Sequence, residues 1–437
     1  MKKFVIAFMC AGSLLFLGVC LPGQTRSGNA EVKTVTPNPV PAVSEAGSGD
    51  KAIAAAPAAA EKALTAADFQ IDNKVFNARD GIKWYCYAAV PKLNLRPEAA
   101  KLYPGLAAVL ERMNKKDLDE AGSFIENTSK NLAEVWAESK DSVPSYVRCN
   151  YLTSEYALIR SDAQAVCLQI FSEIYLGGAH GDHNVKFYKF DPRSGEPIRL
   201  GQLIGNLENA ENFLVKNLPK QHPDACLFDY TETIHGLFAK ARESQDAADI
   251  LEQHWSLTDS GVVFHFNPYE VASYADGILS VNIAYSEHPE LLDGPDAKRI
   301  FARSGAADVP AAILQPEHFK DLVGKWRMVS SETEGDIYDA KTAGIDCTLE
   351  IDKDGTAHYI YNQGDNHDDC GFMRVKVENK AMCDGPMPQW SASLLGGAPE
   401  REFYVTVMPD GKLRLMLFSY MKDKEYPAVM MGNFKRL

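Results

Sequence analysis

The chain has 437 residues and a formal net charge of −14 at pH 7, because 59 Asp and Glu outnumber 45 Lys and Arg. A chain of this length accommodates about two or three domains. The acidic balance argues against nucleic acid or an anionic membrane surface as a partner. None of the nine cysteines stands in a Cys-x-x-Cys pair, which argues against the zinc and redox sites built on that spacing.

Residues 1–20 have the pattern of a signal peptide. Met1-Lys2-Lys3 precedes an apolar run that is too short to span a bilayer. Two processing sites compete: the sequence ending in Cys20 resembles a bacterial lipobox, in which this cysteine is acylated, and cleavage after Ala30 is the alternative. We therefore expect an exported protein of the cell envelope, either membrane-anchored through Cys20 or released into the periplasm or outside the cell.

Residues 21–67 are rich in Pro, Ala, Gly and Ser. Such a composition buries too little apolar surface to offset the entropy of an ordered backbone, so we expect a disordered linker. Three further segments follow: a folded domain at 68–304, a linker at 305–316 and a second folded domain at 317–437.

The first domain alternates blocks of strands with amphipathic helices, which predicts an α+β fold with a mainly antiparallel sheet. We expect strands at 69–71, 82–87, 146–159, 164–175, 185–190, 261–266 and 278–284, and helices at 118–136, 207–218 and 231–254. Outside the cytoplasm, four cysteines of this half could form two disulfides of undetermined connectivity; these are Cys86, Cys149, Cys167 and Cys226.

One stretch of this domain, residues 174–183, is named here the glycine corner. Alternating strands enter and leave it, and Gly177 and Gly178 can take positive φ or let another chain approach closely. We expect a binding surface there, formed together with a downstream bend. Its candidate residues are Tyr175, Gly177, Gly178, His180, Asp182, Tyr269 and Glu270.

Three other interpretations of the glycine corner stay open. His180, Asp182 and His183 could hold a metal ion, and His180 with Glu270 could form an acid–base pair. Alternatively, His180 satisfies buried backbone groups and has only a structural role, and Tyr274 is expected to fill the core. We favour binding, with no catalytic residue, metal ion or cofactor.

Two motifs carry a resemblance to a known family. Residues 175–180 and 266–277 look like the extracytoplasmic domain of RsiV-type anti-sigma factors, which is also the non-catalytic part of PdaC-type peptidoglycan deacetylases. The resemblance implies an α+β domain of largely unassigned function over about 69–303, which binds lysozyme in the anti-sigma factors and accompanies wall chemistry in the deacetylases. Since the chain shows neither a sigma-binding segment nor a deacetylase domain, we expect neither signalling nor deacetylation.

Short strands and tight turns fill residues 317–437, which predicts a small closed antiparallel barrel. Its opening Gly324-Lys325-Trp326 resembles the Gly-x-Trp of lipocalin-like barrels, in which the tryptophan plugs the closed end. By that resemblance, a late basic residue such as Arg436 covers the indole ring.

Taken together, the sequence predicts a non-enzymatic cell-envelope binding protein. Its expected partner is a peptidoglycan glycan or a lysozyme-type wall-cleaving protein, and the membrane is a partner only through the N-terminal anchor. A hydrolase of wall components that uses His180 and Glu270 is one alternative, and a purely structural envelope module is another.

Overall fold

The computed structural model describes residues 64–139, 147–178, 180–243, 245–302, 312–333, 336–382, 388–396, 400–421 and 427–437. The predicted signal peptide, Cys20 and nearly all of the predicted linker at 21–67 lie outside these ranges. None of the helices within them has the length and apolar character needed to cross a membrane.

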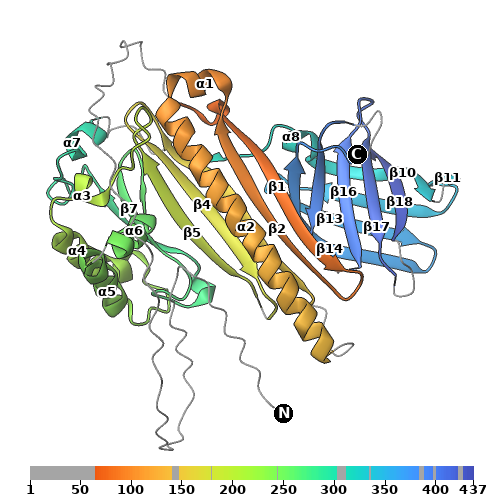
Figure 1. Ribbon diagram of the computed structural model, residues 1–437, viewed down its shortest axis with the longest axis horizontal. Coiled ribbons are helices and arrows are strands. Elements are labelled where there is room, and N and C mark those ends of the chain that lie inside the picture. The colour runs from red at the N-terminus through yellow and green to blue at the C-terminus, as the bar shows by residue number, and fades with distance from the viewer. Residues whose placement is uncertain are drawn as a thin grey trace, which may run out of the picture. The chain divides into compact units, whose positions relative to one another are not determined.

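The first part of the fold is a sheet with the strand order β1-β2-β3-β4-β5 (Figure 1). Its strands are β1 (Phe69–Asp80), β2 (Trp84–Leu95), β3 (Cys149–Ser161), β4 (Val166–Tyr175) and β5 (Asp182–Phe190). Only the β2–β3 pair among these neighbours is parallel. A parallel pair requires a long crossover, and the helices α1 (Pro97–Leu102) and α2 (Pro104–Ser139) lie in that connection.

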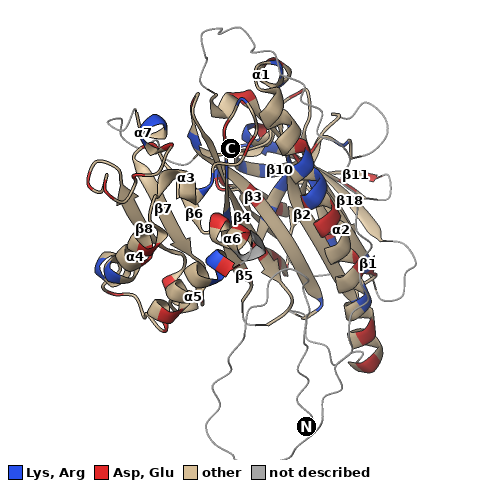
Figure 2. Cartoon of the chain, turned by 60° about the vertical axis from the view of Figure 1, so that its left-hand side comes forward, with Lys and Arg blue, Asp and Glu red and all other residues tan. Residues whose placement is uncertain are grey.

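Helix α2 covers one face of the sheet. Ala88 and Val90 of β2 pack against Ala121 of the helix, while α2 carries charged pairs such as Lys115–Asp119 on its exposed side (Figure 2). Because side chains alternate along a strand, the neighbouring residues Tyr85 and Tyr87 point to the opposite face. The sheet therefore has one face buried under α2 and one face rich in tyrosine.

A second layer packs beside the sheet. It contains a three-stranded sheet in the order β6-β7-β8 and a group of helices around one apolar core. Its elements are α3 (Leu200–Leu203), α4 (Leu207–Gln221), α5 (Tyr230–Glu243), α6 (Gln245–Gln253), β6 (Trp255–Leu257), β7 (Gly261–Phe266), the 3-10 turn η4 (Tyr274–Asp276), β8 (Leu279–Ala284) and α7 (Ala297–Ile300).

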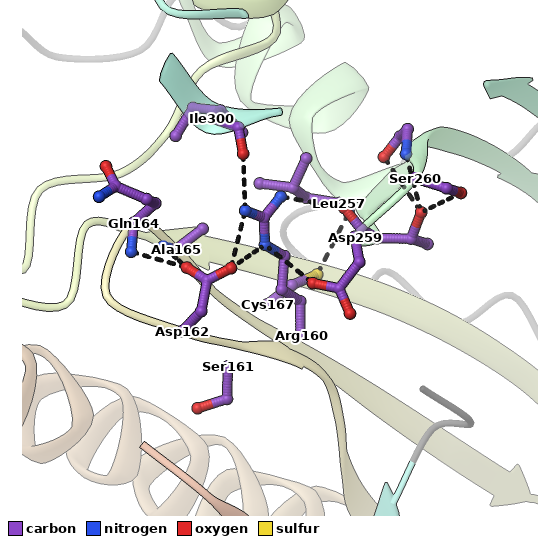
Figure 3. A network of polar contacts seen from close by, with 12 residues as sticks. Arg160, Ser161, Asp162, Gln164, Ala165, Cys167, Leu257, Asp259, Ser260 and Ile300 are labelled. Carbon is purple, nitrogen blue, oxygen red and sulfur yellow. Dashed lines mark hydrogen bonds and ion pairs between the residues drawn. The ribbon is translucent and has the colours of Figure 1, made fainter. Parts of the chain in front are cut away.

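A buried arginine fixes this layer to the end of β3. The guanidinium of Arg160 pairs with the carboxylate of Asp162 at 2.8 Å and donates to the carbonyl oxygen of Ile300 at 2.8 Å (Figure 3). It also donates to the carbonyl oxygen of Thr258 at 3.0 Å and lies 3.5 Å from a carboxylate oxygen of Asp259. A buried charge is tolerated when its hydrogen bonds are satisfied in this way.

The last part of the chain is a closed barrel of eight strands, completed by pairing between β10 and β18. Two short elements, β9 (Ala312–Ile313) and α8 (Phe319–Leu322), precede it, and β11 (Asp336–Asp339) pairs with β10 outside the barrel. The barrel strands are β10 (Gly324–Thr333), β12 (Ile345–Ile351), β13 (Thr356–Gln363), β14 (Asn366–Glu378), β15 (Ser391–Leu395), β16 (Arg401–Val407), β17 (Leu413–Ser419) and β18 (Ala428–Arg436).

Both predictions about the fold class are confirmed. The first part is α+β with a mainly antiparallel sheet, and the second is an all-β barrel. Trp326 is fully buried, and the guanidinium carbon of Arg436 lies 4.4 Å from the centre of its indole ring. The predicted cover of the tryptophan by Arg436 is therefore confirmed as well.

The prediction of disulfides is wrong for the described residues, whose cysteines are all free. Cys86 packs with Trp84 and Leu132 on the α2 side of the sheet, whereas Cys149 packs with Tyr85 on the opposite face. Cys167 is buried in the core of the second layer and Cys226 is exposed. Their side chains therefore lie in different environments, and each of the four thiols is free.

Candidate functional site at the glycine corner

The two glycines at the tip of the glycine corner have left-handed backbone conformations. The φ angle is 86° at Gly177 and 124° at Gly178, a region that residues with a Cβ rarely adopt. A Cβ built on Gly178 would meet no atom within 4 Å, whereas one built on Gly181 would lie 2.9 Å from the carbonyl oxygen of Ile174. Glycine is thus required at position 178 by the positive φ angle, whereas at position 181 it is required by the close approach of the Ile174 backbone.

The histidines of the corner meet two tyrosines of the downstream bend. The ring of His180 stacks on Tyr274 with centroids 3.9 Å apart, and its Nε2 shares a hydrogen bond of 3.4 Å with the hydroxyl of Tyr269. The hydroxyl of Tyr274 shares one of 3.3 Å with Nδ1 of His183. We call these four residues the aromatic cluster.

The aromatic cluster lies at the surface. His180 is exposed, Tyr269 is 50% exposed, and His183 and Tyr274 are partly exposed. Nδ1 of His180 lies 3.0 Å from the carbonyl oxygen of the adjacent Gly181, so this ring is not satisfying a buried group. The expectation that Tyr274 fills the core is wrong, because its ring covers His180 instead.

Tyr269 has a strained backbone, with φ at 68°. A residue other than glycine pays roughly 1–2 kcal/mol for this conformation, and such strain is concentrated at functional sites. A hydrogen bond of 3.1 Å from the backbone N–H of Tyr269 to the carbonyl oxygen of Ala272 holds the bend. The strained bend directs Tyr269 toward His180.

Glu270 is not a partner of His180. One of its carboxylate oxygens pairs with Nε2 of His254 at 3.2 Å, and the other accepts from the backbone N–H of Asn267 at 2.7 Å. The side-chain oxygen of Asn267 in turn accepts from the backbone N–H of Val185 on β5 at 2.7 Å. Glu270 thus fastens the bend that carries Tyr269 to β5 and to the end of α6.

The pair formed by His254 and Glu270 changes the protonation of the imidazole. Burial lowers the pKa of His254, but the hydrogen bond and the negative charge of Glu270 outweigh it, and the net pKa is raised. The raised pKa favours the protonated imidazole that pairs with Glu270, and this pair fixes the bend.

A second group of polar residues lies behind the bend and was missed by sequence reasoning. Nε2 of His265 shares a hydrogen bond of 2.9 Å with the hydroxyl of Ser256, and Phe187 stacks on its ring with centroids 4.2 Å apart. Burial lowers the pKa of His265 to about 3. Ser256 is only 2% exposed, so this serine–histidine contact does not present a nucleophile to solvent.

Lys189 of β5 belongs to the same buried region. Its ammonium lies 3.7 Å from the centre of the Trp255 ring and donates to the carbonyl oxygen of that residue at 3.2 Å. It also lies 3.7 Å from a carboxylate oxygen of Glu252. Burial lowers the pKa of Lys189 to about 8. The surrounding oxygens and the ring of Trp255 stabilise its ammonium form.

The remaining predicted site residues surround the cluster. The hydroxyl of Tyr175 donates to the carbonyl oxygen of Gly178 at 3.0 Å and braces the corner. Asp182 is exposed and lies opposite Ile174, whereas His183 lies opposite Glu173. Consecutive strand residues point to opposite faces, so Asp182 and His183 do not converge. Within the described ranges, no three His, Cys, Asp or Glu side chains are grouped to hold a metal ion.

The electrostatics of the cluster keep Tyr274 in the neutral form. Burial raises the pKa of Tyr274, and the carboxylates of Glu173 and Asp182 raise it further. A neutral phenol both donates and accepts hydrogen bonds. The site therefore combines flat rings with neutral polar groups and two nearby acidic side chains.

Comparison with known families finds a match for one part of this chain. Residues 205–286 match the model of the family described as "Protein of unknown function (DUF3298)". This segment contains Tyr269 and Tyr274, whereas His180 and His183 precede it. No curated protein matches the chain significantly.

Solved structures from the same family are similar to the chain. A DUF3298 member from Bacteroides fragilis NCTC 9343 has 15% identity and a TM-score of 0.39, over 54% of this chain and 98% of the other. A DUF3298 protein from Pseudomonas aeruginosa PAO1 has 16% identity and a TM-score of 0.29, over 51% and 94%. The resemblance to RsiV- and PdaC-type domains stays a prediction. What the comparisons show is a similarity of residues 205–286 to DUF3298, a family of unknown function.

Proposed function

We propose that this protein is a non-enzymatic binding protein of the cell envelope that engages a peptidoglycan glycan through the aromatic cluster. Export and the envelope location rest on the signal pattern of residues 1–20. The observation that carries the proposal is the exposed stack of His180 on Tyr274, with centroids 3.9 Å apart, beside the half-exposed ring of Tyr269.

The chemistry of the cluster suits a sugar. A pyranose ring has an apolar C–H face and a rim of hydroxyl groups, so it packs on flat aromatic rings while its rim needs hydrogen-bond partners. Tyrosine supplies a large apolar ring with a polar tip, and imidazole nitrogens both donate and accept. The carboxylates of Glu173 and Asp182 add acceptors and disfavour anionic ligands such as nucleic acid.

The engagement of Glu270 with His254 favours binding over hydrolysis. The hydrolase alternative requires an acid and a base on either side of a bound ligand. Glu270 is turned toward His254, and the hydroxyl of Ser256 is buried beside His265. Neither Glu270 nor Ser256 is therefore free to act on a ligand at the corner.

Co-sedimentation of the purified protein with peptidoglycan tests the proposal. The wild-type protein should sediment with the wall material, and Tyr274→Ala should weaken the interaction by about 1–3 kcal/mol, the scale of an interface anchor. Tyr338→Ala is the matched control, because Tyr338 is an exposed tyrosine on β11 outside the barrel. If the wild-type protein binds lysozyme and does not sediment with peptidoglycan, the glycan is the wrong ligand and the partner is the predicted lysozyme-type protein.

A further inference from the structure

The barrel packs on the face of the first sheet that lies opposite α2. Leu395 on β15 contacts three buried residues of β2, which are Tyr85, Tyr87 and Ala89, and all four side chains are at most 5% exposed. The preceding residue, Leu394, lies in the core of the barrel, because successive strand residues point to opposite faces. The outer surface of the barrel thus contributes an apolar side chain to the core of the sheet.

Ion pairs fix the barrel to the sheet around this apolar contact. The guanidinium carbon of Arg79 on β1 lies 4.1 Å from the centre of the Tyr420 ring, and its Nε donates to Glu402 on β16 at 3.0 Å. The ammonium of Lys376 on β14 pairs with Glu155 on β3 at 3.0 Å. Both cations are buried, at 8% and 4% side-chain exposure. Because losing a carboxylate would leave a buried cation unpaired, these pairs hold the barrel in one position.

A closed row of tyrosines runs from the barrel contact to the glycine corner. The ring of Tyr87 stacks on Tyr151 at an interplanar angle of 12°, and Tyr151 stacks on Tyr175 at 27°, with centroids 5.3 and 5.5 Å apart. Protein therefore covers both faces of the Tyr151 ring. We call these three residues the tyrosine row, and their close packing makes the position of each ring depend on its neighbours.

The tyrosine row ends on the backbone of the glycine corner. The hydroxyl of Tyr175 donates to the carbonyl oxygen of Gly178 at 3.0 Å. The hydroxyl of Tyr151 donates to the carboxylate of Glu173 at 2.7 Å, and a Cβ built on Gly181 would lie 3.5 Å from the same carboxylate oxygen. Because glycine has the greatest backbone freedom, the corner depends on contacts of this kind to keep one conformation.

We infer that the barrel is a positioning module for the glycine corner. By packing on β2 it holds the tyrosine row, and Tyr175 and Glu173 at the end of the row hold the backbone that carries His180. This inference goes beyond the proposed function, which gives the barrel no role. Only its consequence, that a loosened corner binds peptidoglycan less tightly, rests on the proposed function.

Hydrogen exchange of the backbone amides in residues 174–183 tests the inference on two matched variants of the full chain. Leu395→Ala removes the side chain that contacts β2, and Leu394→Ala removes an equally buried one from the barrel core. Leu395→Ala should accelerate exchange at the corner by about fivefold, since a cavity beside packed groups favours local opening. Leu394→Ala should leave this exchange at the wild-type rate. Leu395→Met nearly conserves the volume and should restore it.

Tyr175→Phe tests the other end of the row, because the ring remains and only the hydroxyl is lost. Exchange at the corner should rise by about fivefold, the effect of one neutral hydrogen bond, while the Tm stays near that of the wild-type protein. Equal exchange rates at the corner in Leu394→Ala and Leu395→Ala would overturn the inference, as would a Tyr175→Phe variant that exchanges like wild type. These readings need no ligand, whereas the proposed function fails separately if the wild-type protein does not sediment with peptidoglycan.

Discussion

Two regions of this molecule use the same kinds of side chain in opposite ways. In the aromatic cluster, His180 and His183 lie at the surface and contact tyrosine hydroxyls at 3.3–3.4 Å. Behind it, His254 and His265 are held by Glu270 and Ser256 at 2.9–3.2 Å inside the fold. The buried pair secures the scaffold, and the exposed pair is available to a ligand.

The comparison shows that the environment of a polar residue, rather than its type, indicates its role. Buried polar groups are retained when their partners are complete, and losing one partner costs more than the contact itself contributes. Exposed groups with long, adjustable contacts can change partners at little cost. Substitutions in the two regions should therefore affect different measurements.

The largest effect is expected at Arg160, a buried charge that contacts two carboxylates and two carbonyl oxygens. Arg160→Met removes its contacts to Asp162 and to the carbonyl oxygens of Thr258 and Ile300. Breaking a buried ion pair from one side typically costs about 3–5 kcal/mol. Denaturant unfolding should reveal a loss of this size, and a loss below about 1 kcal/mol would show that this buried network is not structural.

Glu270 connects the two regions, so its substitution should affect both. Glu270→Gln removes the charge that pairs with His254 and should lower the free energy of unfolding by about 1.5–3 kcal/mol, the value of a hydrogen bond to a charged group. Peptidoglycan binding by the folded fraction should weaken as well, because the bend that carries Tyr269 loses its anchor. Unchanged stability would contradict the assignment of Glu270 to the scaffold.

Acidification should separate His265 from the other groups. Its folded pKa of about 3 lies below the ordinary value of 6.5, so the unfolded state binds the proton first and stability falls as the pH drops below 6.5. Between pH 7 and pH 5, the wild-type protein should lose about 2 kcal/mol relative to His265→Gln.

The raised pKa of His254 acts in the opposite direction. Its contribution is complete below pH 6.5 and is lost as the pH rises through the folded value. Comparing wild type with His265→Gln cancels this contribution, since His254 is present in both. A difference in stability that does not vary with pH would mean that His265 is accessible to protons in the folded state.

The smallest change in stability is expected at Tyr269, where stability should rise while binding weakens. Tyr269→Gly relieves the strain of a φ of 68° but increases the entropy of the unfolded chain, for a net gain in stability of up to about 1 kcal/mol. Binding to peptidoglycan should weaken, because the half-exposed ring is lost. A thermal melt and a sedimentation assay on one preparation measure the change in stability and the change in binding. A destabilised variant that binds normally would contradict the assignment of Tyr269 as a strained binding residue.

Alternation and turn residues predicted most of the strands. The pattern predicts β7 at its observed limits, and the short strands and tight turns predict the barrel. The contact between Trp326 and Arg436 was expected from the resemblance to lipocalin-like barrels. Strand β15, with the sequence Ser-Ala-Ser-Leu-Leu, was missed. It lacks β-branched and aromatic residues, and all five of its residues are buried, so no alternation marks it.

The sequence also predicted that His180 and Tyr269 lie together, but not the position of Glu270. Spacing along the chain indicates which residues share a bend, whereas the direction of a carboxylate depends on the donors that tertiary packing leaves nearby. Here these donors are the backbone N–H of Asn267 and the imidazole of His254. The alignment of Tyr87, Tyr151 and Tyr175 across β2, β3 and β4 likewise depends on the register of three strands, which the sequence pattern does not specify.

The most direct test of the comparison measures stability and binding together for two variants of the glycine corner. His180→Ala should leave the Tm nearly unchanged and weaken binding to peptidoglycan by about 1–3 kcal/mol. Gly178→Val should lower the Tm, because a β-branched residue resists a φ of 124°. If His180→Ala instead melts early and its folded fraction binds as tightly as wild type, then His180 belongs to the scaffold and the glycine corner is not the binding site.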